Sequence, residues 1–132
     1  MNFVEYLIVS QEFLQKAEEN LQAAHLLLEN GLYNAATNRA YYAAFQEAVY
    51  ALESFGVQSG TLTHISVQAL FNGELVNRRK IFPARVRSFL VELQYNRNKA
   101  DYETTHISKT VAARQFAKAK EFVKMIQERK TQ

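Results

Sequence analysis

The sequence contains no cysteine, and this absence excludes several kinds of site. A chain without thiols cannot form a disulfide, a thiolate metal site or a cysteine nucleophile. Turn-forming residues are also scarce, with one proline and four glycines among 132 residues. A chain built from many short strands needs more turn signals than these. The composition therefore favours a helical protein without covalent cross-links.

Long apolar runs are missing as well. No stretch approaches the roughly 18 consecutive apolar residues that span a bilayer. The opening residues "MNFVEYLIVSQEF" have neither the basic start nor the small-residue cleavage site of a signal peptide. We therefore expect a cytoplasmic protein that does not enter a membrane. Apolar residues still make up 48% of the chain, so we expect one domain with its own core over residues 1–132.

Positive charge is concentrated in one central segment. Residues 1–56 hold seven acidic and two basic side chains, whereas residues 76–100 hold seven basic and one acidic. A segment of this kind attracts phosphate groups, although a solvated basic face has the same composition. The candidate nucleic-acid or ligand-binding residues within it are Arg78, Arg79, Lys80, Arg85 and Arg87.

Apolar residues that recur every three or four positions predict helices along most of the chain. Ser10 is a candidate N-cap for the first helix, which should end at Asn30-Gly31 because glycine tolerates a left-handed C-cap. A second helix should follow from about Tyr33 to Phe55, as an antiparallel neighbour.

Three further helices are predicted in the second half of the chain. Thr63 should cap a short helix over "HISVQALFN", and "NRRKIFP" should be a linker. Pro83 suits the first turn of a fourth helix, and Ser108 should cap a fifth. The fold class that follows is all-α, an antiparallel up-and-down four-helix bundle with an additional short helix.

Two polar features interrupt the apolar faces of these helices. Arg39 and Tyr42 lie on a polar and aromatic stripe of the second helix, which indicates a groove, a subunit contact or the border of the core. Extending the apolar stripe of the fourth helix by four residues reaches Arg97, near its expected end. An arginine on the core side of a helix requires a partner.

No glycine-rich phosphate loop, His-Glu-x-x-His motif or paired-carboxylate spacing is present, and we expect no metal and no cofactor. RNA cleavage without a metal needs a base, an acid and a cation. Arg97 could supply the cation. Asp101, one turn later, either pairs with it or takes part in chemistry, and Tyr102 could donate a hydrogen bond, stack on a base or pack. His106 and His64 are the nearest candidate proton carriers, and His64 facing Arg39 would line a pocket.

Three elements of the sequence together resemble the HEPN domain family. They are "GLYNAATNRAYYAAFQEAVYAL", then His64 after a loop, then "RNKADY" before the last helix, and the likeness covers about residues 13–126. The resemblance implies a helical bundle, a homodimer and a minimal nucleotidyltransferase partner in a toxin–antitoxin pair. In ribonuclease members of that family, an arginine and a polar residue precede a histidine by four to six positions, and some members carry a tyrosine that the nucleotidyltransferase modifies with AMP.

The resemblance assigns roles to four residues of this chain. Arg97 and Asn98 match the motif arginine and its polar neighbour, and with Asp101 and Tyr102 they form the candidate catalytic site. No histidine stands at the motif spacing, and Tyr102 is the candidate modification site. Three interpretations stay open: a toxin-like or RNA-binding component of a two-gene module, a non-catalytic bundle that binds a partner protein or nucleotide, and a divergent ribonuclease that uses His64 or His106.

Overall fold

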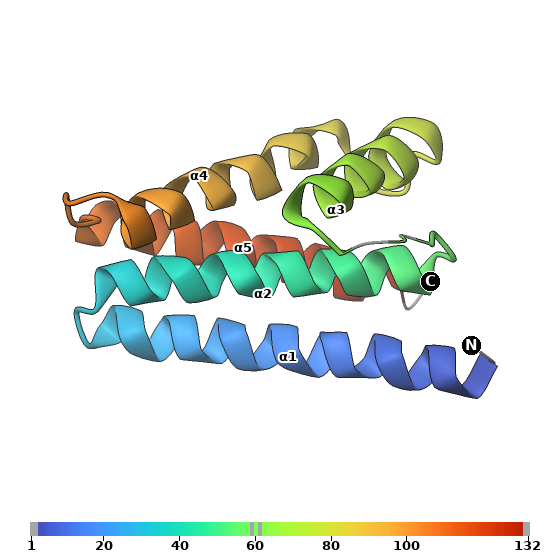
Figure 1. The fold of residues 1–132 in the computed structure, drawn as a ribbon, viewed down its shortest axis with the longest axis horizontal. Coiled ribbons are helices and arrows are strands. Elements are labelled where there is room, and N and C mark those ends of the chain that lie inside the picture. The colour runs from blue at the N-terminus through green and yellow to red at the C-terminus, as the bar shows by residue number, and fades with distance from the viewer. Residues whose placement is uncertain (1–2, 59, 61, 131–132) are drawn as a thin grey trace.

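The computed structural model describes residues 3–58, 60 and 62–130, and within these ranges the regular elements are all helical. In chain order they are α1 (Phe3–Glu29), α2 (Tyr33–Ser54), α3 (His64–Leu70), the π-helix η1 (Phe71–Arg78), the 3-10 helix η2 (Ala84–Ser88), α4 (Phe89–Tyr102) and α5 (Lys109–Lys130). Figure 1 shows them as a bundle of roughly antiparallel helices, so the predicted all-α class is confirmed. In the described ranges no helix is both long and apolar enough to cross a membrane.

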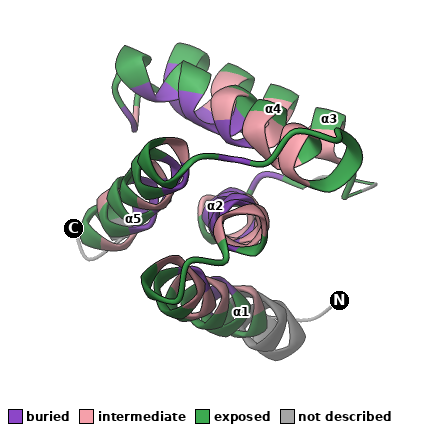
Figure 2. Cartoon of the chain, turned by 90° about the vertical axis from the view of Figure 1, so that its left-hand side faces the viewer, coloured by how far each residue is buried: buried purple, intermediate pink, exposed green. Residues whose placement is uncertain are grey.

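Helix α2 occupies the centre of the bundle, with α1, α5 and the layer of α3 and α4 arranged around it (Figure 2). Its small side chains explain this position, because alanines let neighbouring helices approach closely. The fully or almost fully buried alanines of α2 are Ala36, Ala40, Ala43, Ala44, Ala48 and Ala51. Most larger side chains of the core come from the surrounding elements, among them Phe71, Leu90 and Phe122.

The predicted ends of the first two helices agree with the structure at all but one position. Gly31 and Gly56 follow α1 and α2 with φ angles of +75° and +72°, a backbone conformation that glycine adopts without strain. The prediction that Ser10 caps the first helix is wrong, because α1 already begins at Phe3.

Helices α3 and η1 form one helical run that pairs with η2 and α4 as an antiparallel hairpin, which we call the α3–α4 hairpin (residues 64–102). Side chains join its two arms: Gln68 donates to Gln94, Asn72 donates to the carbonyl of Arg87, and Arg87 donates to Asn77. The prediction that a linker begins at Asn77 is therefore wrong. The helix continues through Gly73 with the wider hydrogen bonding of a π-helix and ends at Arg78.

Two predicted caps are present. The Thr63 hydroxyl accepts from the Ser66 amide, and the Ser66 hydroxyl accepts from the Thr63 amide, so the start of α3 carries a complete capping box. The amide of Val111 donates to the Ser108 hydroxyl before α5. These caps lie at the starts of α3 and α5, on either side of the segment that carries Arg97.

Candidate functional site

Arg97 lies inside α4, which continues to Tyr102, and its side chain is directed toward α2 with 13% of its surface exposed. One terminal nitrogen, Nη2, donates to the hydroxyl of Tyr42 at 2.9 Å and to that of Tyr102 at 3.4 Å. The other, Nη1, donates to the side chain of Asn98 at 3.3 Å. The arginine therefore has the partners that its position on the core side requires.

The ion pair of Arg97 is with Asp101, one turn further along α4. Nε lies 2.9 Å from Oδ2 of Asp101, but the N–H does not point at that oxygen, so the contact is an ion pair without a well-formed hydrogen bond. The Asp101 carboxylate also accepts from Asn38 at 2.8 Å. Burial opposes charge on Arg97, but Tyr42, Tyr102 and Asp101 outweigh it and raise the pKa of Arg97, so the guanidinium stays charged.

The ring of Tyr42 links two arginines from different helices. The guanidinium of Arg39 lies 5.1 Å from its centroid and that of Arg97 lies 5.3 Å from it. Arg97 also lies 5.4 Å from the centre of the Tyr102 ring, so it sits between two aromatic rings. Arg39 is held in turn by the side-chain oxygens of Asn38 and Asn20. We call Arg39, Tyr42, Arg97, Asp101 and Tyr102 the Arg97 cluster.

His64 belongs to the same region, at the first turn of α3. Its ring contacts those of Tyr41, Tyr42 and Phe45, and its Nδ1 is hydrogen-bonded to the hydroxyl of Tyr41. Burial and the positive charge of Arg97 lower the pKa of His64, so the ring is neutral near pH 7. Burial and the neighbouring Tyr42 raise the pKa of Tyr41, so Tyr41 keeps its proton. In the tautomer in which Tyr41 donates to Nδ1, neutral His64 carries its own proton on Nε2, which is then a donor and not a base.

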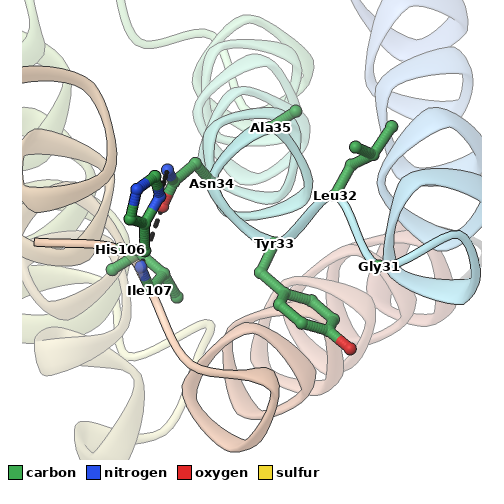
Figure 3. Close-up of a pocket in the computed structure, with 7 residues that line it drawn as sticks. All are labelled: Gly31, Leu32, Tyr33, Asn34, Ala35, His106 and Ile107. Carbon is green, nitrogen blue, oxygen red and sulfur yellow. Dashed lines mark hydrogen bonds between the residues drawn. The ribbon is translucent and has the colours of Figure 1, made fainter.

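His106 lies elsewhere, in the connection between α4 and α5. Its Nδ1 accepts from the side chain of Asn34 at 3.1 Å, and the oxygen of Asn34 accepts from the amide of Ile107 at 2.9 Å. Figure 3 shows this pair at the edge of a hollow of about 480 Å³ next to the start of α2. Asn34 therefore fastens the α4–α5 connection to α2, and the structure brings His64, not His106, to the neighbourhood of Arg97.

The basic residues of the central segment form a separate group at the closed end of the α3–α4 hairpin. Arg78 pairs with Glu74 at 2.5 Å, and Arg79 donates to the carbonyl of Phe55 at 2.7 Å. Arg85 pairs with Glu121 on α5 at 2.5 Å. Lys80 and Arg87 line a hollow at the turn itself. The structure thus divides the predicted ligand-binding residues between two regions.

Sequence reasoning did not identify Asn38 or Tyr41 as members of the site. Asn38 contacts both Asp101 and Arg39, and Tyr41 is hydrogen-bonded to Nδ1 of His64. The signal that could have found them is the series Asn34, Asn38, Tyr41 on α2, which recurs at steps of four and three and therefore lies along one side of the helix.

The protein is thus an all-α bundle in which an arginine lies between two tyrosines where α4 packs on α2. The chain belongs to the HEPN domain family, whose model matches residues 10–130. It is 35% identical over 117 residues to "Putative toxin MJ0605" of Methanocaldococcus jannaschii, covering 88% of this chain and 84% of that protein. It is 27% identical over 120 residues to "UPF0332 protein glr0978" of Gloeobacter violaceus, covering 89% and 93% respectively.

Proposed function

We propose that this HEPN protein is a toxin-like, RNA-binding component of a two-gene module with a minimal nucleotidyltransferase. The main support for this proposal is that the guanidinium of Arg97 lies between the rings of Tyr42 and Tyr102, and that Tyr102 is 73% exposed. Unpaired RNA bases stack on tyrosine rings, and arginine binds phosphates through two nitrogens at once. The name of a relative at 35% identity, a putative toxin, supports the toxin-like part of this role.

The contacts of His64 favour binding over cleavage. A ribonuclease without a metal needs a group that removes the proton of the ribose 2′-hydroxyl. His64 is neutral and its Nδ1 is engaged with the hydroxyl of Tyr41; we propose that Tyr41 donates this bond, so that Nε2 carries the proton. In this state His64 can donate a hydrogen bond to a phosphate oxygen, as Arg97 can. We therefore propose that both side chains hold RNA and that cleavage is not the main activity of the isolated chain.

Fluorescence anisotropy with a labelled single-stranded RNA tests this proposal. Arg97→Met should weaken binding by about tenfold or more, because a charge-assisted contact contributes about 1.5–3 kcal/mol. The slope of log affinity against log salt should fall by about 0.7 for one lost phosphate contact. Arg114→Met, which removes an exposed arginine of α5, is the matched control and should change binding little. Equal affinities for the two variants would contradict the proposal.

Cleavage is measured in parallel, by incubating the protein with total tRNA and no added metal. We expect no products above those of Arg97→Met. Products that disappear in Arg97→Met and in His64→Ala would instead establish a divergent ribonuclease and refute the assignment of His64 as a donor only.

We propose further that the protein is a homodimer joined through the outer face of the α3–α4 hairpin. Ile65 of α3 is 81% exposed, and Val91 and Tyr95 are exposed one turn apart on the face of α4 that leads by helical spacing to Tyr102. A second copy on this face would bring two Arg97 clusters to one seam. Light scattering should show a dimer that Val91→Glu dissociates, whereas Leu26→Glu, a change at an exposed leucine of α1, should leave it intact. A monomeric wild type would refute this part.

Tyr102 is the residue that we propose the partner nucleotidyltransferase modifies. Its ring is largely exposed, and among the described residues its hydroxyl accepts a single long hydrogen bond of 3.4 Å, from Arg97. Incubation with the nucleotidyltransferase and ATP should add an adenylyl group that mass spectrometry places on Tyr102 and that Tyr102→Phe prevents. An adenylyl group on Tyr95 of the same helix would contradict the assignment.

A second candidate function, a non-catalytic bundle that binds a partner protein or a nucleotide, is favoured by one contact. Arg97 forms its ion pair with Asp101 of its own chain. Nucleotide binding without RNA binding in the anisotropy assay, again lost in Arg97→Met, would select this candidate.

A further inference from the structure

We infer that the closed end of the α3–α4 hairpin holds a second anion site, in which Lys80 and Arg87 bind a phosphate group. The hollow there measures about 450 Å³ and lies between the last turn of η1 and the first turn of η2. Its floor is apolar, formed by Val76 and Phe82, and its rim carries the two cations. This site is separate from the Arg97 cluster.

The distribution of charge distinguishes these two cations from their neighbours. Arg78 and Arg85 each pair with a carboxylate, and Arg79 lies 3.6 Å from Glu74. Arg87 donates from Nε to the neutral amide oxygen of Asn77 at 2.6 Å, which orients the guanidinium and leaves its charge uncompensated. Lys80 has no ion pair within the described part of the chain. A phosphate group supplies the missing negative charge and accepts from both side chains.

The backbone at Lys80 adds a second observation. Its φ angle is +54°, the only positive φ of a described residue other than glycine. The amide of Ile81 donates to the carbonyl of Leu75 at 2.8 Å, so Lys80 occupies the left-handed position of a helix C-cap, where glycine or asparagine is usual. A lysine is strained there, and its side chain contributes nothing to the cap. We attribute its presence to the cation that it places at the hollow.

The position of the hollow suits a ligand longer than one phosphate. Arg87 and Arg97 are ten residues apart, which corresponds to about 15 Å along a helix. An RNA strand bound at the Arg97 cluster could therefore place a backbone phosphate a few nucleotides away at Lys80 and Arg87. This RNA part of the inference rests on the proposed function, whereas binding of a free phosphate group does not.

Lys80→Gly is the sharpest variant, because it removes the cation and relieves the strained backbone, so the fold is retained. Paired with Arg87→Gln, it should weaken binding of the labelled RNA by about three- to tenfold and lower the salt slope by roughly 1.4 for two lost contacts. As a control, Lys124→Gln combined with Arg114→Gln removes the same charge from α5. Its effects on the RNA affinity and on the salt slope should each be at most half of those of the hairpin double variant.

Inorganic phosphate distinguishes the two sources of the anion. Titrated into the ¹⁵N-labelled wild type at constant ionic strength, it should shift the amide signals of residues 77–87 in a saturable way, and the double variant should show no such shift. Phosphate shifts without RNA binding would support this site and refute the proposed function. RNA binding with no phosphate shift, and no difference between the hairpin and α5 double variants, would overturn the second site and leave the proposed function standing.

Discussion

Removing the hydroxyl of Tyr42 should destabilise the protein more than removing that of Tyr102, although both accept from the same nitrogen of Arg97. The Tyr42 contact is 2.9 Å long and half-buried, whereas the Tyr102 contact is 3.4 Å long and exposed. A hydrogen bond to a charged group that is lost in a partly buried setting costs about 1.5–3 kcal/mol, and an exposed one costs far less. We expect about 1.5 kcal/mol for Tyr42→Phe and less than about 0.5 kcal/mol for Tyr102→Phe. The ring contacts with Arg39 and Arg97 remain in both variants.

Urea denaturation followed by circular dichroism measures this difference. With a slope of about 1–3 kcal/mol per molar urea, the Tyr42→Phe midpoint should fall by roughly 0.5–1.5 M at an unchanged slope. Protein concentration must be constant, because dimerisation would contribute to the apparent stability. In an Arg97→Met background the effect of Tyr42→Phe should largely disappear, since the partner is gone. A Tyr42→Phe effect of the same size in both backgrounds would show that the hydroxyl stabilises the fold by another route.

Three further predictions concern single residues. The pKa of His64, followed by NMR, should lie below 6.5 and should rise in Arg97→Met, because a repelling charge is removed. The stability that comes from neutral His64 is present above pH 6.5 and is lost as the pH falls through the lower pKa of the folded state. An unchanged pKa of His64 in Arg97→Met would contradict the electrostatic coupling between the two side chains. Lys80→Gly should raise the free energy of unfolding by about 0.5–1 kcal/mol, because glycine has no side-chain clash at positive φ, and a loss of stability in urea would refute this. Asn34→Ala should cost about 1 kcal/mol and speed hydrogen exchange of the Ile107 amide, whereas unchanged exchange would mean that Asn34 does not hold this connection.

The helices of this fold were predictable where apolar periodicity and capping residues coincide. Gly31, Thr63 and Ser108 mark helix ends that depend on local hydrogen bonds and φ angles, and local sequence encodes both. The continuation of the third helix through Gly73 was not predictable in this way. Packing of Phe71 and Leu75 against the core holds that turn helical, and such packing depends on residues far away in the sequence.

The candidate site was predictable only in part, for a similar reason. The inward direction of Arg97 and its ion pair with Asp101 follow from helical spacing within α4. The contact of Arg97 with Tyr42 joins residues 55 positions apart and requires the α2–α4 packing. The closeness of His64 to the Tyr42 ring likewise depends on how α3 crosses α2. Sequence spacing could not choose between His106 and His64 as a neighbour of Arg97, whereas the structure ties His106 to Asn34.

The contacts of Arg97 also indicate how a ligand could enter the cluster. Each guanidinium nitrogen has a polar neighbour, but Nε makes no hydrogen bond within the described part of the chain, so a phosphate can bind there by displacing only the ion-pair partner. Tyr42 is the least replaceable partner, because its bond is short and its ring is fixed against Arg39. Asp101 is the most replaceable, because its ion pair lacks hydrogen-bond geometry and its carboxylate keeps a second donor in Asn38. A phosphate that takes the place of this carboxylate would keep the charge balance of Arg97 and leave Asp101 hydrogen-bonded, so the ion pair within the chain is compatible with an anion-binding role and does not exclude it.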